Sequence, residues 1–414
     1  MRLGTSLKLT ELRRVIGGGG GPSEVVNVKV GSFTTPGSAG NQAITGLGFQ
    51  PKGIIFFSAH VSTEDSVQVH DSLSLGFSDG SNDRVGYHFS RDNLSSSDCN
   101  REFRNDACGL GYALGTVSLL TKFSLVSLDA DGFTINYSTS GSSAVEFYYI
   151  AYGGDVTVEV GSFDTPNTPG IQNVSTGIAN ADFLMLISGM GGTGNENALG
   201  ATSLFHMGVA TGPANEGHTS SRANDNQSPT VTEKFQATDS IYSLLNGSGG
   251  LIDEAQFNGF TGSGFDLNYI TKDGTVRRIY YLTIKGGQWE VGNDTSRTSA
   301  GIKATTTSFQ PKGLGILGHS AASSGSVTAI SKHTFGVSDE TNDRCSAGID
   351  LDNVGTSDCA RINQTDEVIS AFTGTGSVAE EANVDSFNPT DFTLNYGVAD
   401  ATAREFIWWV CGDN

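Results

Sequence analysis

The sequence predicts an all-β protein made of three tandem antiparallel β-sandwich domains, jelly-roll-like, behind a short N-terminal helical or extended anchor. First, 55 of the 414 residues are glycine, a density that ordinary helices do not tolerate. Second, the apolar residues form short blocks separated by Gly, Ser, Thr and Asn, as in strands joined by turns. Third, the same motifs return at a fixed period, which is the mark of repeated structural units.

The repeat period is 130 residues. The motif Val-Gly-Ser-Phe at 30–33 returns at 160–163, an offset of 130, and Phe-Gln-Pro-Lys-Gly at 49–53 returns at 309–313, an offset of 260. A unit of this length is a normal size for one hydrophobic core. The chain is therefore divided into an anchor and hinge at 1–24 and three sandwiches at 25–154, 155–287 and 288–414.

Two kinds of strand are expected in each unit. The segment Phe-Thr-Ile-Asn-Tyr at 133–137 alternates apolar and polar residues, as a half-buried strand does. The segments 54–57 and 148–152 are continuously apolar, which favours central strands buried on both sides. Asp-Ala-Asp-Gly at 129–132 is typical of a turn. An antiparallel sandwich of roughly eight strands accounts for this pattern.

The first 24 residues differ from the rest of the chain. An apolar helical face with two arginines opposite it is followed by a glycine tract at 17–21. The residues of this segment are Leu9, Leu12, Val15 and Ile16 on the apolar face and Arg13 and Arg14 on the other. It is interpreted as a docking peptide on a flexible hinge, with a frayed terminus as the alternative.

The charge balance limits the classes of partner. Lys and Arg number 24 against 44 Asp and Glu, so the net charge is 24 − 44 = −20. This charge argues against nucleic acid or an anionic membrane as the main partner. No stretch approaches 18 apolar residues, and the N-terminus lacks the uninterrupted apolar segment of a signal peptide, so we expect no membrane insertion and synthesis in a cytoplasm.

Catalytic motifs are missing from the sequence. It contains no Gly-x-Ser-x-Gly elbow, no His-Glu-x-x-His, no phosphate-binding loop and no Cys-x-x-Cys pair. We therefore expect no enzymatic activity and no organic cofactor.

A doubled acidic cluster is the candidate metal site. It comprises Asp79, Asp83, Asp92 and Asp98 in the first unit and Asp339, Asp343, Asp352 and Asp358 in the third. Carboxylates interleaved with Ser and Asn can supply the six to eight oxygens that Ca²⁺ takes. The same residues also stabilise turns by accepting hydrogen bonds from their own backbone, and Arg84 and Arg344 lie within the motif. Both interpretations stay open, and the middle unit lacks the Ser-Asp pair.

The repeated motifs resemble those of repeat-containing structural proteins of tailed bacteriophages. The resemblance rests on Val-Gly-Ser-Phe-Thr-Thr-Pro at 30–36, on Phe-Gln-Pro-Lys-Gly before an apolar strand, and on Asp-Gly-Phe-Thr-Ile-Asn-Tyr before Tyr-Ile-Ala-Tyr-Gly-Gly. The short Leu/Arg segment that runs into a glycine tract is similar to the start of some tail-fibre proteins. The resemblance covers nearly the whole chain and carries over no catalytic residues.

This resemblance implies a non-enzymatic protein on the virion exterior. Such a head decoration, spike or fibre-like component would be made in the host cytoplasm and bound to capsid or tail proteins through its N-terminal segment, as a homotrimer. The first alternative is a tail-associated adhesin that recognises a host surface glycan. The second is a secreted carbohydrate-binding module.

Overall fold

The computed structural model describes residues 24–189, 192–321 and 324–414, and this part of the chain is all-β. The fold class predicted from the sequence is confirmed. All strand pairs are antiparallel, and the described residues contain one short 3-10 helix, η1 (Thr193–Asn195). The predicted anchor residues Leu9, Leu12, Arg13, Arg14, Val15 and Ile16 lie outside the described residues.

The strands fall into three equivalent groups of eleven. Repeat 1 contains β1 (Val26–Thr34), β2 (Gly40–Thr45), β3 (Pro51–Ser58), β4 (Gln68–Val69), β5 (Asp71–Ser78), β6 (Asp83–Ser90), β7 (Cys99–Arg104), β8 (Gly109–Ala113), β9 (Ser118–Asp129), β10 (Gly132–Ser140) and β11 (Glu146–Gly154). Repeat 2 contains β12 (Thr157–Asp164), β13 (Gly170–Ser175), β14 (Phe183–Ser188), β15 (Gly200–Ala201), β16 (Ser203–Gly212), β17 (Asn215–Ala223), β18 (Thr232–Ala237), β19 (Tyr242–Leu245), β20 (Leu251–Thr261), β21 (Gly264–Thr271) and β22 (Arg278–Lys285). Repeat 3 contains β23 (Gln288–Thr295), β24 (Gly301–Thr306), β25 (Gly313–Ala321), β26 (Thr328–Ala329), β27 (Ser331–Ser338), β28 (Asp343–Asp350), β29 (Cys359–Gln364), β30 (Ile369–Gly374), β31 (Ser377–Asn388), β32 (Asp391–Val398) and β33 (Glu405–Gly412).

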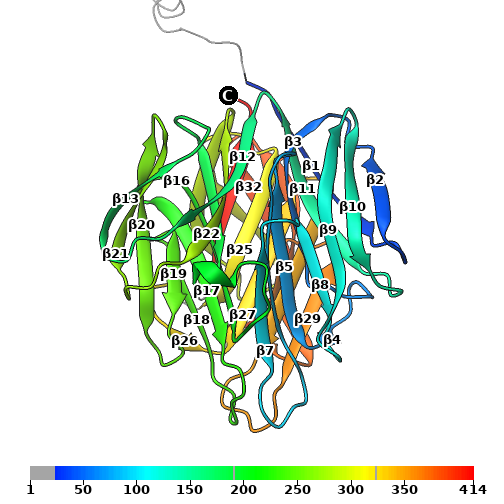
Figure 1. Cartoon of the computed structure of the whole chain (residues 1–414). Helices are drawn as coiled ribbons and strands as arrows, with labels where there is room; N and C mark the ends of the chain where they lie inside the picture. Colours follow the sequence, from blue (N-terminus) through cyan, green and yellow to red (C-terminus); the bar gives the residue numbers. More distant parts are fainter. Residues whose placement is uncertain (1–23, 190–191, 322–323) are drawn as a thin grey trace, which may run out of the picture.

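Each repeat is a sandwich of one larger and one smaller sheet (Figure 1). In repeat 1 the four-stranded sheet has the order β2-β10-β9-β8, and it packs on a sheet that contains β1, β11, β3, β5, β6 and β7. Phe56 of the larger sheet meets Phe123 of the smaller one edge to face, with ring centroids 5.5 Å apart. This aromatic packing forms a separate hydrophobic core inside the sandwich.

The other face of each larger sheet is also buried. In β3, Ile54 and Phe56 point into the sandwich, whereas Ile55 and Phe57 point into a second core that is shared by all three repeats. Burial on both faces explains why such strands are continuously apolar. Aromatic pairs cross every boundary in the shared core: Phe103–Phe205, Phe183–Trp409 and Phe57–Phe335, with ring centroids 5.8, 6.1 and 4.9 Å apart.

The three repeats exchange edge strands in a closed cycle. The short β15 of repeat 2 completes the larger sheet of repeat 1, β26 of repeat 3 completes that of repeat 2, and β4 of repeat 1 completes that of repeat 3. Each larger sheet therefore has seven strands, and its edge is covered by the neighbouring repeat. The result is a pseudo-threefold ring formed by one chain.

Arginine side chains hold two of the exchanged segments in place. Arg361 donates hydrogen bonds to the carbonyl oxygen of Val69, at 2.6 Å, and to that of His60. Arg101 does the same for the carbonyl oxygens of Ala201 and Thr202. A charged donor on two carbonyls fixes both the position and the direction of each segment.

The number of strands differs from the sequence prediction, which was roughly eight per unit. The structure has eleven. One of the additional strands in each repeat is β4, β15 or β26, which is only two residues long and too short to show an alternating pattern. Among the described residues, no helix is long and apolar enough to cross a membrane.

Candidate functional site

The ring has two distinct ends (Figure 1). The chain enters and leaves the described fold at one end, where Asn414 N donates a hydrogen bond to Glu24 O at 3.0 Å. At the opposite end three equivalent loops extend beyond the sheets, coloured cyan, green and orange. We call residues 91–98, 224–231 and 351–358 the tip loops.

An aspartate at the start of each tip loop binds the next repeat. Each carboxylate accepts a hydrogen bond from the first backbone amide of the strand that follows the neighbouring tip loop. The three bonds run from Cys99 N to Asp225 Oδ1 at 3.1 Å, from Thr232 N to Asp352 Oδ1 at 2.8 Å and from Cys359 N to Asp92 Oδ1 at 3.1 Å. These bonds form a cycle, so the tip loops interlock around the ring.

An asparagine follows each of these aspartates in a left-handed backbone conformation. Asn93, Asn226 and Asn353 have φ of 60°, 55° and 56°, values that asparagine adopts more readily than most residues. The amide of each donates to a carbonyl of another tip loop, at 2.7 to 2.9 Å. The three asparagines are exposed, so the repeats present the same pair, Asp-Asn, at three equivalent positions.

Asp79 and Asp339 lie just before β6 and β28, at the opposite end of these strands from the tip loops. Asp79 Oδ1 accepts the backbone amides of Ser81 and Asn82 at 2.8 and 2.7 Å, which closes the turn between β5 and β6. Its other oxygen accepts the amide of Val160 in repeat 2 at 2.8 Å. Asp339 makes the equivalent contacts: it closes its own turn in repeat 3 and accepts the amide of Val30 in repeat 1.

Asp83 and Asp343 bind the smaller sheet of their own repeat. Asp83 Oδ2 accepts the amide of Leu125 at 2.9 Å, and Asp343 Oδ2 accepts that of Val384 at 2.8 Å. Burial raises the pKa of both carboxyl groups, to about 6 for Asp343. In repeat 2 Glu216 performs the same task for the amide of Phe257, at 2.6 Å, and burial raises its pKa to about 7.

The remaining predicted residues, Asp98 and Asp358, lie at the end of their tip loops. Asp98 forms an ion pair with Arg91 at 2.7 Å and accepts a hydrogen bond from Asn100 Nδ2 at 2.6 Å. The backbone carbonyl of Asp358 accepts the amide of Leu351 at 3.0 Å.

The four predicted carboxylates of repeat 1 are therefore divided between the two ends of β6. Asp79 precedes β6 and Asp83 is its first residue, whereas Asp92 and Asp98 follow it. A strand of eight residues spans roughly 25 Å, at about 3.3 Å per residue. The four side chains do not converge on one point. Asp79, Asp83 and Asp92 accept hydrogen bonds from backbone amides, and Asp98 is bound by the side chains of Arg91 and Asn100.

Sequence reasoning missed two equivalent residues in the middle repeat. Asp225 matches Asp92 and Asp352, and Glu216 matches Asp83 and Asp343, so the middle repeat retains both tasks. Five residues separate the paired residues Ala210 and Glu216, whereas four separate Ser78 and Asp83, so the β16–β17 hairpin contains one extra residue that shifts the register by one position. An alignment that allowed this insertion would have found both residues.

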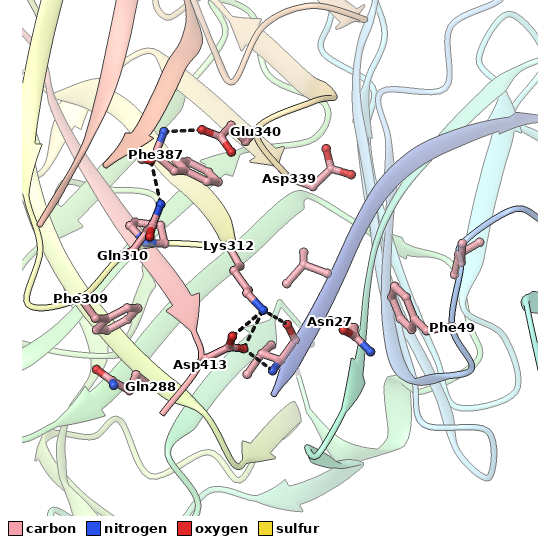
Figure 2. A pocket seen from close by; sticks show the side chains of 14 residues that line it. Asn27, Phe49, Gln288, Phe309, Gln310, Lys312, Asp339, Glu340, Phe387 and Asp413 are labelled. Carbon is pink, nitrogen blue, oxygen red and sulfur yellow. Dashed lines mark hydrogen bonds and ion pairs between the residues drawn. The ribbon is translucent and has the colours of Figure 1, made fainter. Parts of the chain in front are cut away.

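A groove of about 710 Å³ lies at the end where the chain enters, between repeats 1 and 3 (Figure 2). Lys312 Nζ contacts Asp413 at 2.6 Å and Val26 O at 3.4 Å, and Asp413 also accepts the amide of Val26 at 2.8 Å. Elsewhere on the repeat 3 side, Phe387 N donates to Glu340 at 2.8 Å, and Asn27 and Phe49 line the repeat 1 side. We call this the terminal groove; it places a mixed polar and aromatic lining beside the point where the chain emerges.

The geometry thus offers two surfaces for interaction, the tip loops and the terminal groove. No family model, curated protein or solved structure matches this chain.

Proposed function

We propose that this protein is a non-enzymatic structural component on the exterior of a bacteriophage particle, a head decoration, spike or fibre-like protein attached through residues 1–24. The observation that carries this proposal is the arrangement of the two ends of the ring. The described chain begins at Glu24 at one end of the ring, and the tip loops occupy the other. A ring tethered in this way presents its tip loops away from the particle.

The construction of the ring suits an exposed particle component. Each larger sheet has an edge covered by a strand of the neighbouring repeat, which leaves fewer open edges for unwanted pairing. The net charge of −20 favours solubility at high copy number. Both properties support a protein that must stay folded and separate on a crowded surface.

Immunogold electron microscopy of purified particles, with antibody to residues 25–414, tests this function. Label on the head supports a decoration or spike protein, and label along the tail supports a fibre-like component. Absence of label from every particle would overturn the proposal. Deletion of residues 1–21 should abolish incorporation while the circular dichroism spectrum stays that of an all-β protein; normal incorporation would refute the attachment role.

We propose that trimerisation of the chain runs through residues 1–24. Inside the ring, the repeats already pair one another's sheet edges. Light scattering should therefore report a homotrimer for the full chain and a monomer for residues 25–414. A trimer that survives the truncation would place the interface on the ring itself.

A second candidate function is a tail-associated adhesin for host surface glycan. The three exposed tip-loop asparagines favour it, since amide and carboxylate groups on loops can hold sugar hydroxyls. A glycan array with the purified chain tests this function. The triple variant Asn93→Gly, Asn226→Gly and Asn353→Gly keeps a residue that tolerates positive φ and removes the side chains, so it should abolish glycan binding. Binding that survives in the variant would exclude the tip asparagines.

A further inference from the structure

Three ionisable side chains meet in the interior between repeats 1 and 3. Asp71 lies at the start of β5, His88 near the end of β6 and His333 near the start of β27. Their exposed fractions are 1%, 0% and 2%. One possible ligand atom from each lies within 4.8 Å of the other two, and His333 Nδ1 lies 3.7 Å from Asp71 Oδ1. None of these residues belongs to the tip loops or the terminal groove.

Several polar atoms of this cluster lack hydrogen-bond partners. They are Asp71 Oδ1, His88 Nε2 and both ring nitrogens of His333. A buried polar atom without a partner destabilises the folded state. One ligand bound between the three side chains would satisfy one atom of each.

The kinds of side chain suit a cation. A neutral imidazole offers a lone pair on one ring nitrogen, an ionised carboxylate offers oxygen lone pairs, and both are common ligands of zinc.

The surroundings orient one ligand and allow the side chains to lie close together. His88 Nδ1 lies 3.0 Å from Ser203 Oγ, and with Nδ1–H donating to this hydroxyl the lone pair remains on Nε2. Metal-binding histidines are commonly oriented by such a bond on the other ring nitrogen. Gly348 faces the cluster, and a Cβ at this position would lie 1.8 Å from Asp71 Oδ1 and 2.5 Å from His333 Cε1. Only glycine at position 348 allows Asp71 and His333 to approach the backbone this closely.

The equivalent positions in the other repeats do not carry these side chains. The register of the hairpins aligns Asp71 with Ser203 and Ser331, and His333 with Leu73 and Phe205. His88 aligns with Ser221 and Gly348. The cluster is therefore formed once, at the boundary between repeats 1 and 3. These two repeats are not consecutive in the chain.

We propose that Asp71, His88 and His333 bind one Zn²⁺ ion that joins repeat 1 to repeat 3. Two imidazole nitrogens and one carboxylate oxygen form a typical three-residue zinc set, with water as the fourth ligand. Zinc–ligand distances of about 2.0–2.2 Å require the three atoms to lie closer together when the ion is bound. Because the site is buried, the ion enters as the repeats close during folding.

Metal analysis of the full chain tests this proposal. The protein is unfolded with a chelator, refolded with or without Zn²⁺ and freed of excess metal by gel filtration. We expect one Zn²⁺ per chain by mass spectrometry of the metal and a melting temperature several degrees higher than that of the metal-free protein. Refolding with Co²⁺ should give the visible absorption of a four-coordinate site.

The chain itself supplies conservative variants. Asp71→Ser and His333→Leu introduce the residues found at equivalent positions, and each should lose the bound zinc and the zinc-dependent rise in melting temperature. If one fails to fold by circular dichroism, the other and His88→Ser provide the same test. The control is His218→Val, because His218 is equally buried, has both nitrogens hydrogen-bonded, and aligns with Val85. This variant should keep its zinc.

Two results would overturn the proposal. One is wild-type protein that takes up no zinc on refolding and melts at the same temperature with and without it. The other is zinc that stays bound at full occupancy in folded Asp71→Ser and His333→Leu variants, which would place the ion elsewhere.

Discussion

The carboxylate of Asp339 accepts a hydrogen bond from the backbone amide of Val30 at 2.9 Å, so the last repeat is bound directly to the first strand of the first repeat. The same carboxylate closes its own turn through the amides of Thr341 and Asn342. One side chain therefore stabilises a turn and a boundary at once.

We expect Asp339→Ala to destabilise the protein by about 1–3 kcal/mol, because three backbone amides lose their acceptor. Chemical denaturation followed by tryptophan fluorescence measures the change. Asp385→Ala is the control, because Asp385 is exposed and its hydroxyl contact with Thr393 is 3.4 Å long. Equal stability of the two variants would contradict the role of Asp339.

The buried Glu216 should make stability depend on pH. Its folded-state pKa of about 7 lies above the usual value of an unfolded glutamate, so the folded state holds the proton more tightly. This contribution is fully present below the unfolded pKa and is lost as the pH rises through about 7. The difference corresponds to about 3 kcal/mol at most.

Glu216→Gln keeps an oxygen for the amide of Phe257 and removes the titration. We expect the variant to lose less stability than the wild type between pH 5 and pH 8, a range chosen around the unfolded and folded pKa values. Denaturation curves across this range measure the effect. Parallel pH profiles for the two proteins would show that Glu216 does not titrate there.

Gly348→Ala should weaken the boundary between repeats 1 and 3 by about 1–3 kcal/mol, because the added methyl group overlaps Asp71 and His333. Thermal unfolding by calorimetry measures this loss. Gly355→Ala in a tip loop is the matched control, since nothing lies within 4 Å of its added Cβ and its φ is not positive. A loss of the same size in both variants would mean that crowding is not the cause.

Arg361→Ala should release the segment of repeat 1 that completes the larger sheet of repeat 3. We expect faster amide hydrogen exchange in residues 61–70, because the carbonyl oxygens of His60 and Val69 lose their donor. Hydrogen-exchange mass spectrometry measures the rate. Arg297→Ala, which removes contacts only within its own turn, should leave these residues unchanged. Unchanged protection in Arg361→Ala would show that β4 is held without this side chain.

The fold class could be predicted from the sequence, because the 130-residue repeat and the apolar pattern of buried strands can both be recognised in it. Continuous apolar runs such as Ile54 to Phe57 mark strands buried on both faces, and the structure places them between a sandwich core and the shared core. The exchange of β4, β15 and β26 could not be predicted, since a two-residue strand has no periodicity and its partner lies in another repeat.

The buried cluster of Asp71, His88 and His333 was also beyond sequence reasoning. Repeat analysis looks for residues that recur, and these three occupy positions that differ in the other repeats. Their proximity arises from the closure of the ring, which brings β5 and β27 together. A search restricted to side chains that recur in every repeat does not find a site of this kind.

The hydrogen bond between Asn414 N and Glu24 O bears on the order in which the three repeats must follow one another along the chain. The equivalent connection between repeats 1 and 2 is a continuous peptide near Gly154 and Asp155, where Asp155 N donates to Val25 O at 2.8 Å. Since the two ends of the described fold already touch, a short linker could join them and the chain could be cut between Gly154 and Asp155 instead. Such a circular permutant should fold to the same ring, because its contacts do not depend on which of the three repeats is synthesised first.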